Sequence, residues 1–422
     1  MRVMVIGGGG REHAIIKKLR ENKSIEVLYA LPGNDGMKGD ATLVPIGAKD
    51  LDKICDFAVE KKIDFAVVAP DDPLVLGLVD RLNAVGVKCF GPKKNAAIIE
   101  GSKAFSKALM KKYGIPTARY EIFTDLEEAI RYVDTQEPPI VVKADGLALG
   151  KGVIIAVTRE EAKAALREMM ENGKFGDSGK TVVIEEYLEG PEVSVLSFCD
   201  GNIVVPMVSG MDHKRAQDGD KGLNTGGMGT IAPNPFYTKE IAAICKERIF
   251  DKTVAAMKAE GRPFRGCLYF GLMITRDGPK VIEYNCRFGD PETQVVLPLM
   301  ESDLLTVMMK TADGTLDPSD VKFSTGSACC VIMASAGYPE HYEKGYEIVR
   351  KGEIDGEVYF AGAKDRDGTL VTNGGRVLGV TVKGDTLIGA VTKCYEEIKK
   401  ITFENAYYRS DIGAKAIKAE KN

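Results

Sequence analysis

Two oxygen-bearing side chains, Glu283 and Asn285, stand one residue apart at the end of a short β-prone run, residues 279–282. In a strand, residues two apart point to the same face of the sheet, so the carboxylate and the amide oxygen lie side by side. Mg²⁺ prefers oxygen ligands and commonly takes only one or two from protein, with phosphate and water supplying the rest. The pair therefore predicts a divalent-cation site, and a polar strand end is the alternative.

Three more charged residues follow in a turn that contains glycine and proline: Arg287, Asp290 and Glu292. Turns of this kind run over the surface, where their charges face a ligand or solvent rather than a core. Residues 283–294 thus combine a predicted metal site with three further charges.

A lysine inside a β-prone run marks a second candidate site. Lys143 follows the apolar residues 140–142, and a glycine-bearing loop with Lys151 separates this run from the next, residues 153–157. The order strand, loop, strand predicts a flap that could close over a polyphosphate, with the two lysines supplying charge. It is not a P-loop, because Gly152 stands where that motif requires a hydroxyl. Lys151 alone would be a solvated turn residue, and only the pair favours a function.

An acidic run, residues 185–192, follows the β-prone residues 181–184. An extended segment of this kind can offer backbone groups to a base, and a later carboxylate can accept ribose hydroxyls. The alternative is the end of an edge strand that carries several acids.

A run of four glycines, residues 7–10, leaves the first predicted strand and opens a helix. Bare backbone N–H groups at the positive end of a helix form an anion site. A dinucleotide fold does not fit, because the third glycine position of its motif is Glu12 or His13 and the second strand ends without the expected acid. The phosphate of a smaller sugar phosphate fits better, and a tight turn without a ligand is the alternative.

Residues 211–229 form a long stretch rich in glycine and charge, without a helix or strand pattern. Structureless loops of this length are uncommon in compact domains and are often functional, with disorder as the alternative. His213 in this loop could be a general base or an exposed spectator.

The elements that must position these residues begin with a doubly wound parallel sheet. Residues 3–6, 26–31, 63–69 and 87–90 are predicted strands. Between them, apolar residues recur with helical spacing on one face of residues 51–59, from Leu51 to Val59. From Ile98 the pattern is helical through residue 112. After residue 324, strands at 328–333 and 377–382, a helix near 388–398, and hairpins at 352–356 and 371–375 predict a smaller α+β domain.

Length and composition agree with such an architecture. At 422 residues the chain predicts about three domains. A net charge of −4 gives no electrostatic case for nucleic acid or an anionic membrane, and no apolar run approaches a membrane span. Nine cysteines without a Cys-x-x-Cys motif favour reduced core thiols, and three scattered histidines do not suggest a metal cluster. We therefore expect a cytoplasmic protein.

Several segments together resemble one known family. The most specific is residues 287–294, Arg-Phe-Gly-Asp-Pro-Glu-Thr-Gln, and the glycine-rich start and residues 31–36, 100–103, 212–229 and 409–413 match in order. On these segments the chain resembles the phosphoribosylamine–glycine ligases of the ATP-grasp superfamily, over essentially its whole length.

The resemblance implies an α/β and α+β multidomain fold. An N-terminal doubly wound domain would span residues 1–100, an ATP-grasp domain 101–324 with a lid at approximately 124–190, and a C-terminal domain 325–422. It implies ATP as co-substrate, bound between the lid and the centre. The nucleotide-binding positions carried over are Lys103, Lys143, Lys151, Glu186, Tyr187, Leu188 and Glu192.

The resemblance further implies that Glu283 and Asn285 hold Mg²⁺ or Mn²⁺, that Arg287 binds the glycine carboxylate, and that Asp212 and Asp290 lie near the amines. The implied reaction joins glycine to 5-phospho-β-D-ribosylamine through glycyl phosphate in purine synthesis. No protein nucleophile is needed, and catalysis would rest on positioning and charge neutralisation. The substrate-binding positions implied are Gly8, Gly9, Gly10, Asn34, Lys214 and Gly227. The expected partners are small molecules, and we expect a monomer or a weak dimer.

The chain departs from the family pattern at two places. Asp71 stands where the family has glutamate, which leaves any sugar contact of that acid open, and Phe360 replaces a histidine, which speaks against an essential histidine there. Two rivals remain. An ATP-grasp carboxylase or formyl-phosphate transferase would respond to a different acid, and a nucleotide-binding regulator would bind ATP without releasing phosphate.

Overall fold

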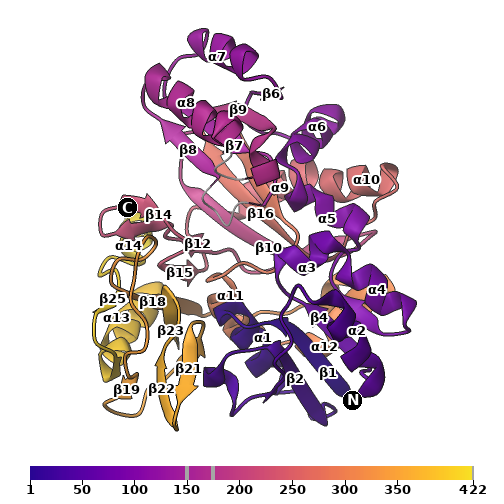
Figure 1. Cartoon of the computed structure of the whole chain (residues 1–422), viewed down its shortest axis with the longest axis vertical. Helices are drawn as coiled ribbons and strands as arrows, with labels where there is room; N and C mark the ends of the chain where they lie inside the picture. The colour runs from indigo at the N-terminus through magenta and orange to yellow at the C-terminus, as the bar shows by residue number, and fades with distance from the viewer. Residues whose placement is uncertain (148–151, 173–175, 421–422) are drawn as a thin grey trace.

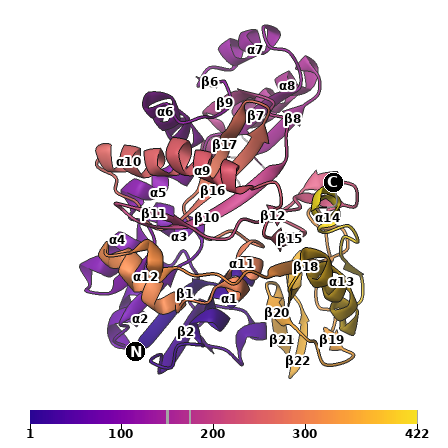
Figure 2. The ribbon, with the colours of Figure 1, turned by 180° about the vertical axis from the view of Figure 1, so that it is seen from behind.

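The computed structural model describes residues 1–147, 152–172 and 176–420. Lys151, one of the two predicted flap lysines, therefore lies outside the described residues. Figures 1 and 2 show the N-terminal sheet and the C-terminal domain side by side, with the central sheet beyond them and the lid at the far end of the molecule. No helix among the described residues has the length and apolarity that crossing a membrane requires.

The N-terminal domain is a five-stranded sheet in which every pairing is parallel, in the order β3-β2-β1-β4-β5. In β1, Met4 and Ile6 belong to one hydrophobic core and Val3 and Val5 to the other. Both faces are thus covered, which explains the uninterrupted apolar runs and confirms the doubly wound prediction. The elements are β1 (Arg2–Gly7), α1 (Gly10–Leu19), β2 (Val27–Pro32), β3 (Thr42–Leu43), α2 (Leu51–Glu60), β4 (Phe65–Val68), α3 (Asp71–Leu76), α4 (Leu78–Ala84) and β5 (Lys88–Phe90).

Two details of the helical predictions are wrong. Val59 of α2 is 56% exposed, because the buried side of that helix is formed by Ile54, Cys55, Phe57 and Ala58. The helical stretch after Ile98 is two helices, α5 (Lys94–Gly101) and α6 (Lys103–Tyr113). Ser102 separates them, since its side chain accepts a hydrogen bond from Phe105 N and caps α6.

The lid is a four-stranded antiparallel sheet, in the order β6-β9-β7-β8, with two helices packed against it. Every residue of β7 is buried, Lys143 included. The lid elements are β6 (Tyr120–Phe123), α7 (Leu126–Asp134), β7 (Ile140–Ala144), β8 (Val153–Ala156), α8 (Arg159–Leu166) and β9 (Val182–Glu186).

The central domain is built on a second antiparallel sheet, in the order β11-β10-β16-β17. Strands β16 and β17 form a long hairpin whose second strand ends at Asn285, as the predicted metal pair requires. The elements are β10 (Glu192–Asp200), β11 (Val204–Pro206), α9 (Lys239–Cys245), α10 (Asp251–Ala259), β16 (Arg265–Thr275), β17 (Gly278–Asn285), α11 (Thr293–Leu299) and α12 (Leu304–Asp313).

The C-terminal domain contains a sheet in the order β12-β15-β18-β23-β20, with β25 paired to β18. Its first two strands come from the segment that the sequence assigned to the ATP-grasp domain. The elements are β12 (Met211–Asp212), β15 (Gly229–Ala232), β18 (Ser327–Ser335), β19 (Val349–Arg350), β20 (Glu357–Phe360), β21 (Ala363–Arg366), β22 (Thr369–Thr372), β23 (Arg376–Gly384), α13 (Leu387–Glu397), β24 (Ile401–Thr402), β25 (Ala406–Tyr407) and α14 (Ala414–Glu420).

Two loop predictions are corrected by this sheet. Residues 352–356 and 371–375 do not turn hairpins: β19 pairs with β24, β20 pairs with β23, and the hairpin is β21–β22. The stretch 211–229 is not structureless, since it contains β13 (Arg215–Gln217) and β14 (Lys221–Asn224), which pair with each other. All nine cysteines are buried free thiols, as the sequence predicted.

Candidate active site

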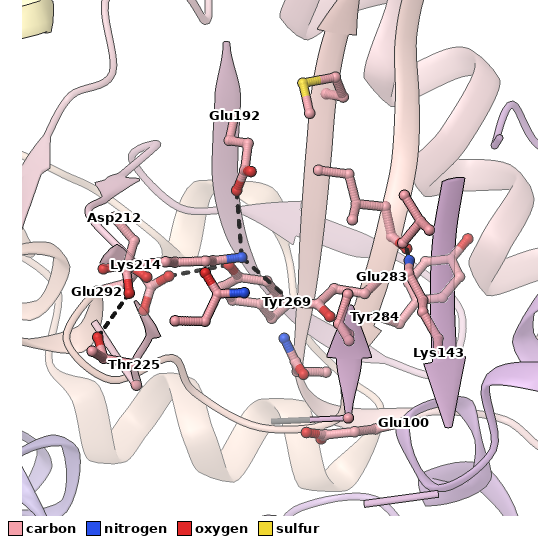
Figure 3. A pocket seen from close by; sticks show the side chains of 18 of the residues that line it. Glu100, Lys143, Glu192, Asp212, Lys214, Thr225, Tyr269, Glu283, Tyr284 and Glu292 are labelled. Atoms are coloured by element: carbon pink, nitrogen blue, oxygen red, sulfur yellow. Dashed lines mark hydrogen bonds and ion pairs between the residues drawn. The ribbon is translucent and has the colours of Figure 1, made fainter. Parts of the chain in front are cut away.

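A cavity of about 930 Å³ opens between the lid sheet, the central sheet and the β13–β14 hairpin. Figure 3 shows side chains from the lid and the central sheet converging on it, among them Lys143, Glu192 and Glu283. Twelve of the predicted site residues line it: Lys103, Lys143, Glu186, Tyr187, Leu188, Glu192, Asp212, Lys214, Glu283, Asn285, Arg287 and Asp290. Five described ones are not in its lining: Gly8, Gly9, Gly10, Asn34 and Gly227.

The predicted metal pair stands at the end of β17. Glu283 and Asn285 both line the cavity, and Tyr284 between them packs into a hydrophobic core, with its hydroxyl 2.9 Å from Thr253 Oγ1. Burial alone would raise the pKa of Glu283, but the positive charges of Lys214, Lys143 and Lys103 outweigh it and lower that pKa. An ionised carboxylate beside an amide oxygen is a donor set that suits Mg²⁺ when phosphate and water complete the shell.

The lid and helix α6 together contribute a buried group of three charges. Lys143 Nζ lies 2.9 Å from one carboxylate oxygen of Glu185, and Lys107 Nζ lies 3.0 Å from the other. Lys107 also donates to Thr117 Oγ1 at 2.8 Å, and burial lowers its pKa to about 8. Two lysines with one carboxylate leave one net positive charge facing the cavity, which suits a phosphate.

Lys143 also connects the lid to the metal pair. Its Nζ donates to the carbonyl oxygen of Ile282, next to Glu283, at 3.2 Å. Lys103, at the start of α6, donates to Gly146 O at 2.9 Å, in the loop between β7 and β8. The predicted lysines therefore surround the position of the metal pair from two elements.

The predicted adenine segment follows β9. The carboxylate of Glu186 accepts from the backbone N of Arg119 at 2.9 Å and from its Nε at 2.7 Å, so that side chain is engaged by protein. Tyr187 is 40% exposed and follows the strand at the cavity wall. Backbone groups, rather than the Glu186 side chain, are thus the groups available to a base.

A group of acids and one lysine occupies the wall opposite the lid. Lys214 Nζ lies 3.4 Å from Glu192 and 3.7 Å from Glu283, and Figure 3 shows it extended between them. The charge of Glu192 is the largest influence that raises the Lys214 pKa well above its usual value. Burial and the charge of Glu292 raise the pKa of Asp212 well above its usual value, and Asp212 Oδ1 has no hydrogen-bond partner among the described residues.

Arg287 is held by a residue that sequence reasoning missed. Its Nη2 lies 3.0 Å from Glu100 Oε1, and Glu100 Oε2 accepts from Cys286 N at 2.7 Å. Arg287 Nε is buried and has no hydrogen-bond partner in the described part of the chain. The guanidinium is thus fixed by Glu100 while one donor remains for a ligand.

Asp290 stands where the glycine-rich start meets the turn that follows β17. Its Oδ2 accepts from Arg11 N at 3.4 Å, at the beginning of α1, and its Oδ1 accepts from Gln294 at 2.8 Å. Arg376 of β23 lies 3.3 Å from the same carboxylate. Burial alone would raise the pKa of Asp290, but the charges of Arg376 and Arg11 outweigh it and lower that pKa.

The glycine-rich loop itself is closely surrounded by protein. Gly9 N donates to Glu12 Oε2 at 2.7 Å, and a Cβ at Gly9 would lie 2.8 Å from the same oxygen. Asn34 donates to Gly8 O at 2.8 Å and to Phe360 O at 2.9 Å, so it ties the loop to the C-terminal domain. A carboxylate, Asp290, already stands at the positive end of α1.

Gly227 acts through the backbone. Its φ is +113°, a region that favours glycine, and an added Cβ would lie 2.6 Å from Asp212 Oδ1 and 2.4 Å from Pro291 Cδ. A side chain there would therefore displace Asp212, although Gly227 does not line the cavity.

Two further cavity residues, Arg376 and Tyr338, come from the C-terminal domain and carried no signal in the sequence. Arg376 donates to the carbonyls of Gly226 at 2.8 Å and Asp290 at 2.9 Å. Lys107, by contrast, could have been found from the sequence. It stands four residues after Lys103 in a helical pattern, which places both lysines on one side of α6.

His213 is buried and is therefore not an exposed spectator. Its Nε2 accepts from Gly413 N at 3.2 Å, so the proton is on Nδ1, which lies 3.1 Å from Gly229 O. Burial is the largest influence that lowers its pKa to about 4.

This pKa predicts a pH effect on stability. Between pH 6.5 and 4 the unfolded chain holds a proton on His213 and the folded chain does not, so stability falls as pH falls through that window, by at most about 1.4 kcal/mol per pH unit. We expect the melting temperature of His213→Gln to fall less steeply there than that of the unaltered protein. An unchanged melting profile together with loss of the acidic limb of kcat/KM would instead make His213 a base.

Comparison with known proteins covers the whole length. Residues 1–100, 101–293 and 328–415 match the N, ATP-grasp (A) and C domains of phosphoribosylglycinamide synthetase. The chain is 49% identical to a phosphoribosylamine–glycine ligase of Halalkalibacterium halodurans, over 99% of this chain and 97% of that relative. It is likewise 49% identical to one of Listeria monocytogenes, over 99% of this chain and 100% of that relative.

Solved structures agree with these matches. The crystal structure of a phosphoribosylamine–glycine ligase from Thermotoga maritima superposes with a TM-score of 0.84 at 38% identity, covering 98% of this chain and 100% of that one. A biotin carboxylase domain from Hydrogenobacter thermophilus, in complex with MgADP and bicarbonate, gives a TM-score of 0.75 at 18% identity, covering 96% of this chain and 91% of that one. The second likeness shows a shared fold.

Proposed function

Because the chain belongs to the phosphoribosylamine–glycine ligase family, an ATP-dependent ligase that joins glycine to phosphoribosylamine in purine biosynthesis, we propose how its cavity divides the work of that reaction. The reaction passes through glycyl phosphate. ATP lies between the lid and the central sheet, and the amine substrate enters from the side of Asp212, Asp290 and Arg376. The observation that carries this division is the Lys143–Ile282 hydrogen bond, which joins the lid lysine to the strand end with Glu283.

In the first step a carboxylate oxygen of glycine attacks the γ-phosphorus of ATP, the bond to the β-phosphate oxygen breaks, and ADP leaves. Arg287 binds the glycine carboxylate through the donor that Glu100 leaves open. Lys103 and Lys143 offset the phosphate charge, and Lys151 has the same role by resemblance. The segment Glu186 to Leu188 holds adenine and Glu192 holds ribose. Such catalysis rests on positioning and electrostatics.

In the second step the amine nitrogen of phosphoribosylamine attacks the carbonyl carbon of glycyl phosphate, and the bond to the phosphate oxygen breaks. The nitrogen loses a proton as the amide forms, and the leaving phosphate takes it up. Asp212 and Asp290, at the acceptor side of the cavity, orient the two amines. The step uses no protein nucleophile, in agreement with nine buried thiols and a His213 ring whose nitrogens are both engaged.

Glu283 and Asn285 are the residues that would hold a divalent cation, Mg²⁺ or Mn²⁺. The cation supplies charge neutralisation on the transferred phosphate when bound. The described residues contain no group of three or more histidine, cysteine or acidic ligands, so the donor set is the carboxylate and amide pair with phosphate and water.

The glycine-rich loop, with Asn34, Lys214 and Gly227, forms the sugar-phosphate side. The start of α1 supports this proposal, because it lies against Asp290, which also lines the cavity. The loop amides of Gly9 and Arg11 already donate to carboxylates, so the loop shapes the acceptor side as well as offering an anion site.

The test is phosphate release with ATP and Mg²⁺, with glycine and phosphoribosylamine added separately and together. We expect release to require both substrates and to yield glycinamide ribonucleotide. Bicarbonate or formate in place of glycine would distinguish a carboxylase or formyl-phosphate transferase. ATP binding without phosphate release under any of these conditions would indicate a regulator and overturn the proposal.

A substitution in the glycine-rich loop separates the two ligands. Gly9→Val adds a branched side chain at a position where an added Cβ would lie 2.8 Å from Glu12 Oε2 and 3.4 Å from Asp290 Oδ2. We expect a raised KM for phosphoribosylamine and little change for ATP, because the nucleotide contacts other domains. Circular dichroism and melting should show a retained fold. If the variant binds ATP more weakly and its KM for phosphoribosylamine is unchanged, the loop binds the nucleotide instead of the sugar phosphate.

A further inference from the structure

We propose that residues 407–415, which we call the C-terminal clamp, hold the β13–β14 hairpin in place as a wall of the cavity and so keep water from the reacting acyl group. Figures 1 and 2 show the C-terminal helix α14 beside β14. This inference rests on the proposed function, since it needs glycyl phosphate as the group that is shielded.

The hairpin separates the cavity from solvent. Arg215, Asp220 and Asn224 line the cavity, while Gln217 and Lys221 on the same two strands are exposed. Among the described residues β13 and β14 pair only with each other. A two-stranded hairpin is marginally stable alone, so its position must be fixed from outside.

Arg409 supplies the central contact of the clamp. Its side chain is 1% exposed, and Nη1 donates to the carbonyl of Arg215 at 3.0 Å. Its Nη2 lies 2.9 Å from Asp220, and Asp411 accepts from Nε and Nη2 at 2.7 and 2.8 Å. One buried guanidinium thus binds the first strand and the turn of the hairpin from almost two hundred residues away in the chain.

Four other contacts complete the clamp. Tyr407 donates to Ala216 O at 2.6 Å, and Gly219 N at the hairpin turn donates to Asp411 at 2.8 Å. Ser410 N donates to the carboxylate of Asp218 at 2.9 Å, and Lys415 pairs with Asp220. The contacts therefore cover the first strand and the turn, and the second strand is held through its pairing with the first.

The charges of the clamp are in place at neutral pH. Burial alone would raise the pKa of Asp411, but hydrogen bonds from Arg409 and Gly219 and the charge of Arg409 lower it to about 2. The ion pairs of Arg409 are partly shielded from solvent. The two hydrogen bonds from its guanidinium to the Asp411 carboxylate also fix the orientation of both side chains.

The chemistry explains why a fixed wall matters. Glycyl phosphate is an acyl phosphate, and water can attack its carbonyl carbon in place of the amine. The bond to the phosphate oxygen then breaks, glycine and inorganic phosphate are released, and the water proton goes to solvent. Exclusion of water is a recognised way to suppress this kind of side reaction. With the hairpin displaced, the enzyme would thus consume ATP without forming the amide.

Arg409 is a positioning residue by this argument, because it does not line the cavity itself. Ordinary packing of the C-terminal domain would give the same contacts without any effect on coupling. The two cases differ in one quantity, the phosphate released per glycinamide ribonucleotide formed. A protein that is merely less stable loses both products equally.

The experiment measures that ratio in Arg409→Gln and in the Asp218→Ala/Tyr407→Phe double variant, which removes two milder contacts. Ile398→Ala is the matched control, since Ile398 is fully buried in the core of the same domain and away from the hairpin. We expect a ratio of one for the unaltered protein and the control, and a rise of about twofold or more in the clamp variants. Arg409→Lys, which keeps the charge, should fall between them.

Each outcome decides one question. Clamp variants that fold and keep a ratio of one overturn the clamp, whatever their turnover. If Arg409→Gln does not fold, the double variant decides in the same way. If the unaltered protein forms no glycinamide ribonucleotide at all, the proposed function fails, and that result is visible before any variant is made.

Discussion

Glu283→Gln is expected to lower turnover with ATP and Mg²⁺ by about 100-fold or more, since loss even of an outer-shell partner of a metal costs up to about 100-fold. The carboxylate ends β17 beside Asn285 and is kept ionised by three neighbouring lysines. An amide in its place keeps the shape and removes the charge that the cation needs. Folding should be little affected, because the side chain lines a cavity rather than a core.

The measurement has two parts that do not depend on each other. Turnover is measured as a function of the Mg²⁺ concentration. Nucleotide binding is measured by calorimetry in the presence and in the absence of Mg²⁺. Asp277→Asn is the matched control, because it makes the same chemical change at the exposed turn of the same β16–β17 hairpin. Full activity of Glu283→Gln at limiting Mg²⁺ would show that the cation is held elsewhere.

Lys143→Met is expected to weaken ATP binding by about 1.5–3 kcal/mol, a factor of about 10 to 150, the cost of one charge-assisted hydrogen bond. Methionine keeps most of the length of the side chain within β7. Glu185 retains Lys107 at 3.0 Å, so its buried carboxylate is not left without a partner. The effect should therefore appear in the KM for ATP more than in stability.

Two controls separate charge from structure. Lys163→Met removes a lysine that pairs with Asp134 at 2.5 Å on the lid helices, away from the cavity, and should leave the KM for ATP unchanged. The double variant Lys143→Met/Glu185→Gln restores one net positive charge, because Lys107 then no longer faces an ionised carboxylate. If the double variant recovers ATP binding, Lys143 serves to neutralise Glu185 and does not contact phosphate.

The local patterns of the chain predicted what depends on neighbours in sequence. The apolar strands of residues 3–6 and 65–68 and the strand end with Glu283 and Asn285 follow from periodicity and turn residues alone. A lysine in the middle of an apolar strand was equally visible at Lys143. Such signals are local because a strand or helix repeats over a few residues.

Only the tertiary structure decided which charges face each other. Lys107 and Lys143 share Glu185, Arg287 is held by Glu100, and Arg376 joins Asp290, across separations of 42 to 187 residues in the chain. Nothing in a local pattern specifies such partners, because the free energy that pairs two buried charges depends on the elements that exclude water around both.

The same limit applies to two loops, residues 7–10 and 211–229. The sequence predicted an anion site at residues 7–10, and only the structure shows that Glu12 accepts from Gly9 N and that Asp290, 279 residues away from Arg11, accepts from Arg11 N. It predicted a structureless loop at 211–229, but Arg409 and its neighbours bind a hairpin there. Residue types and short spacings determine which groups can react, whereas the packing of distant segments determines which of them remain free to do so.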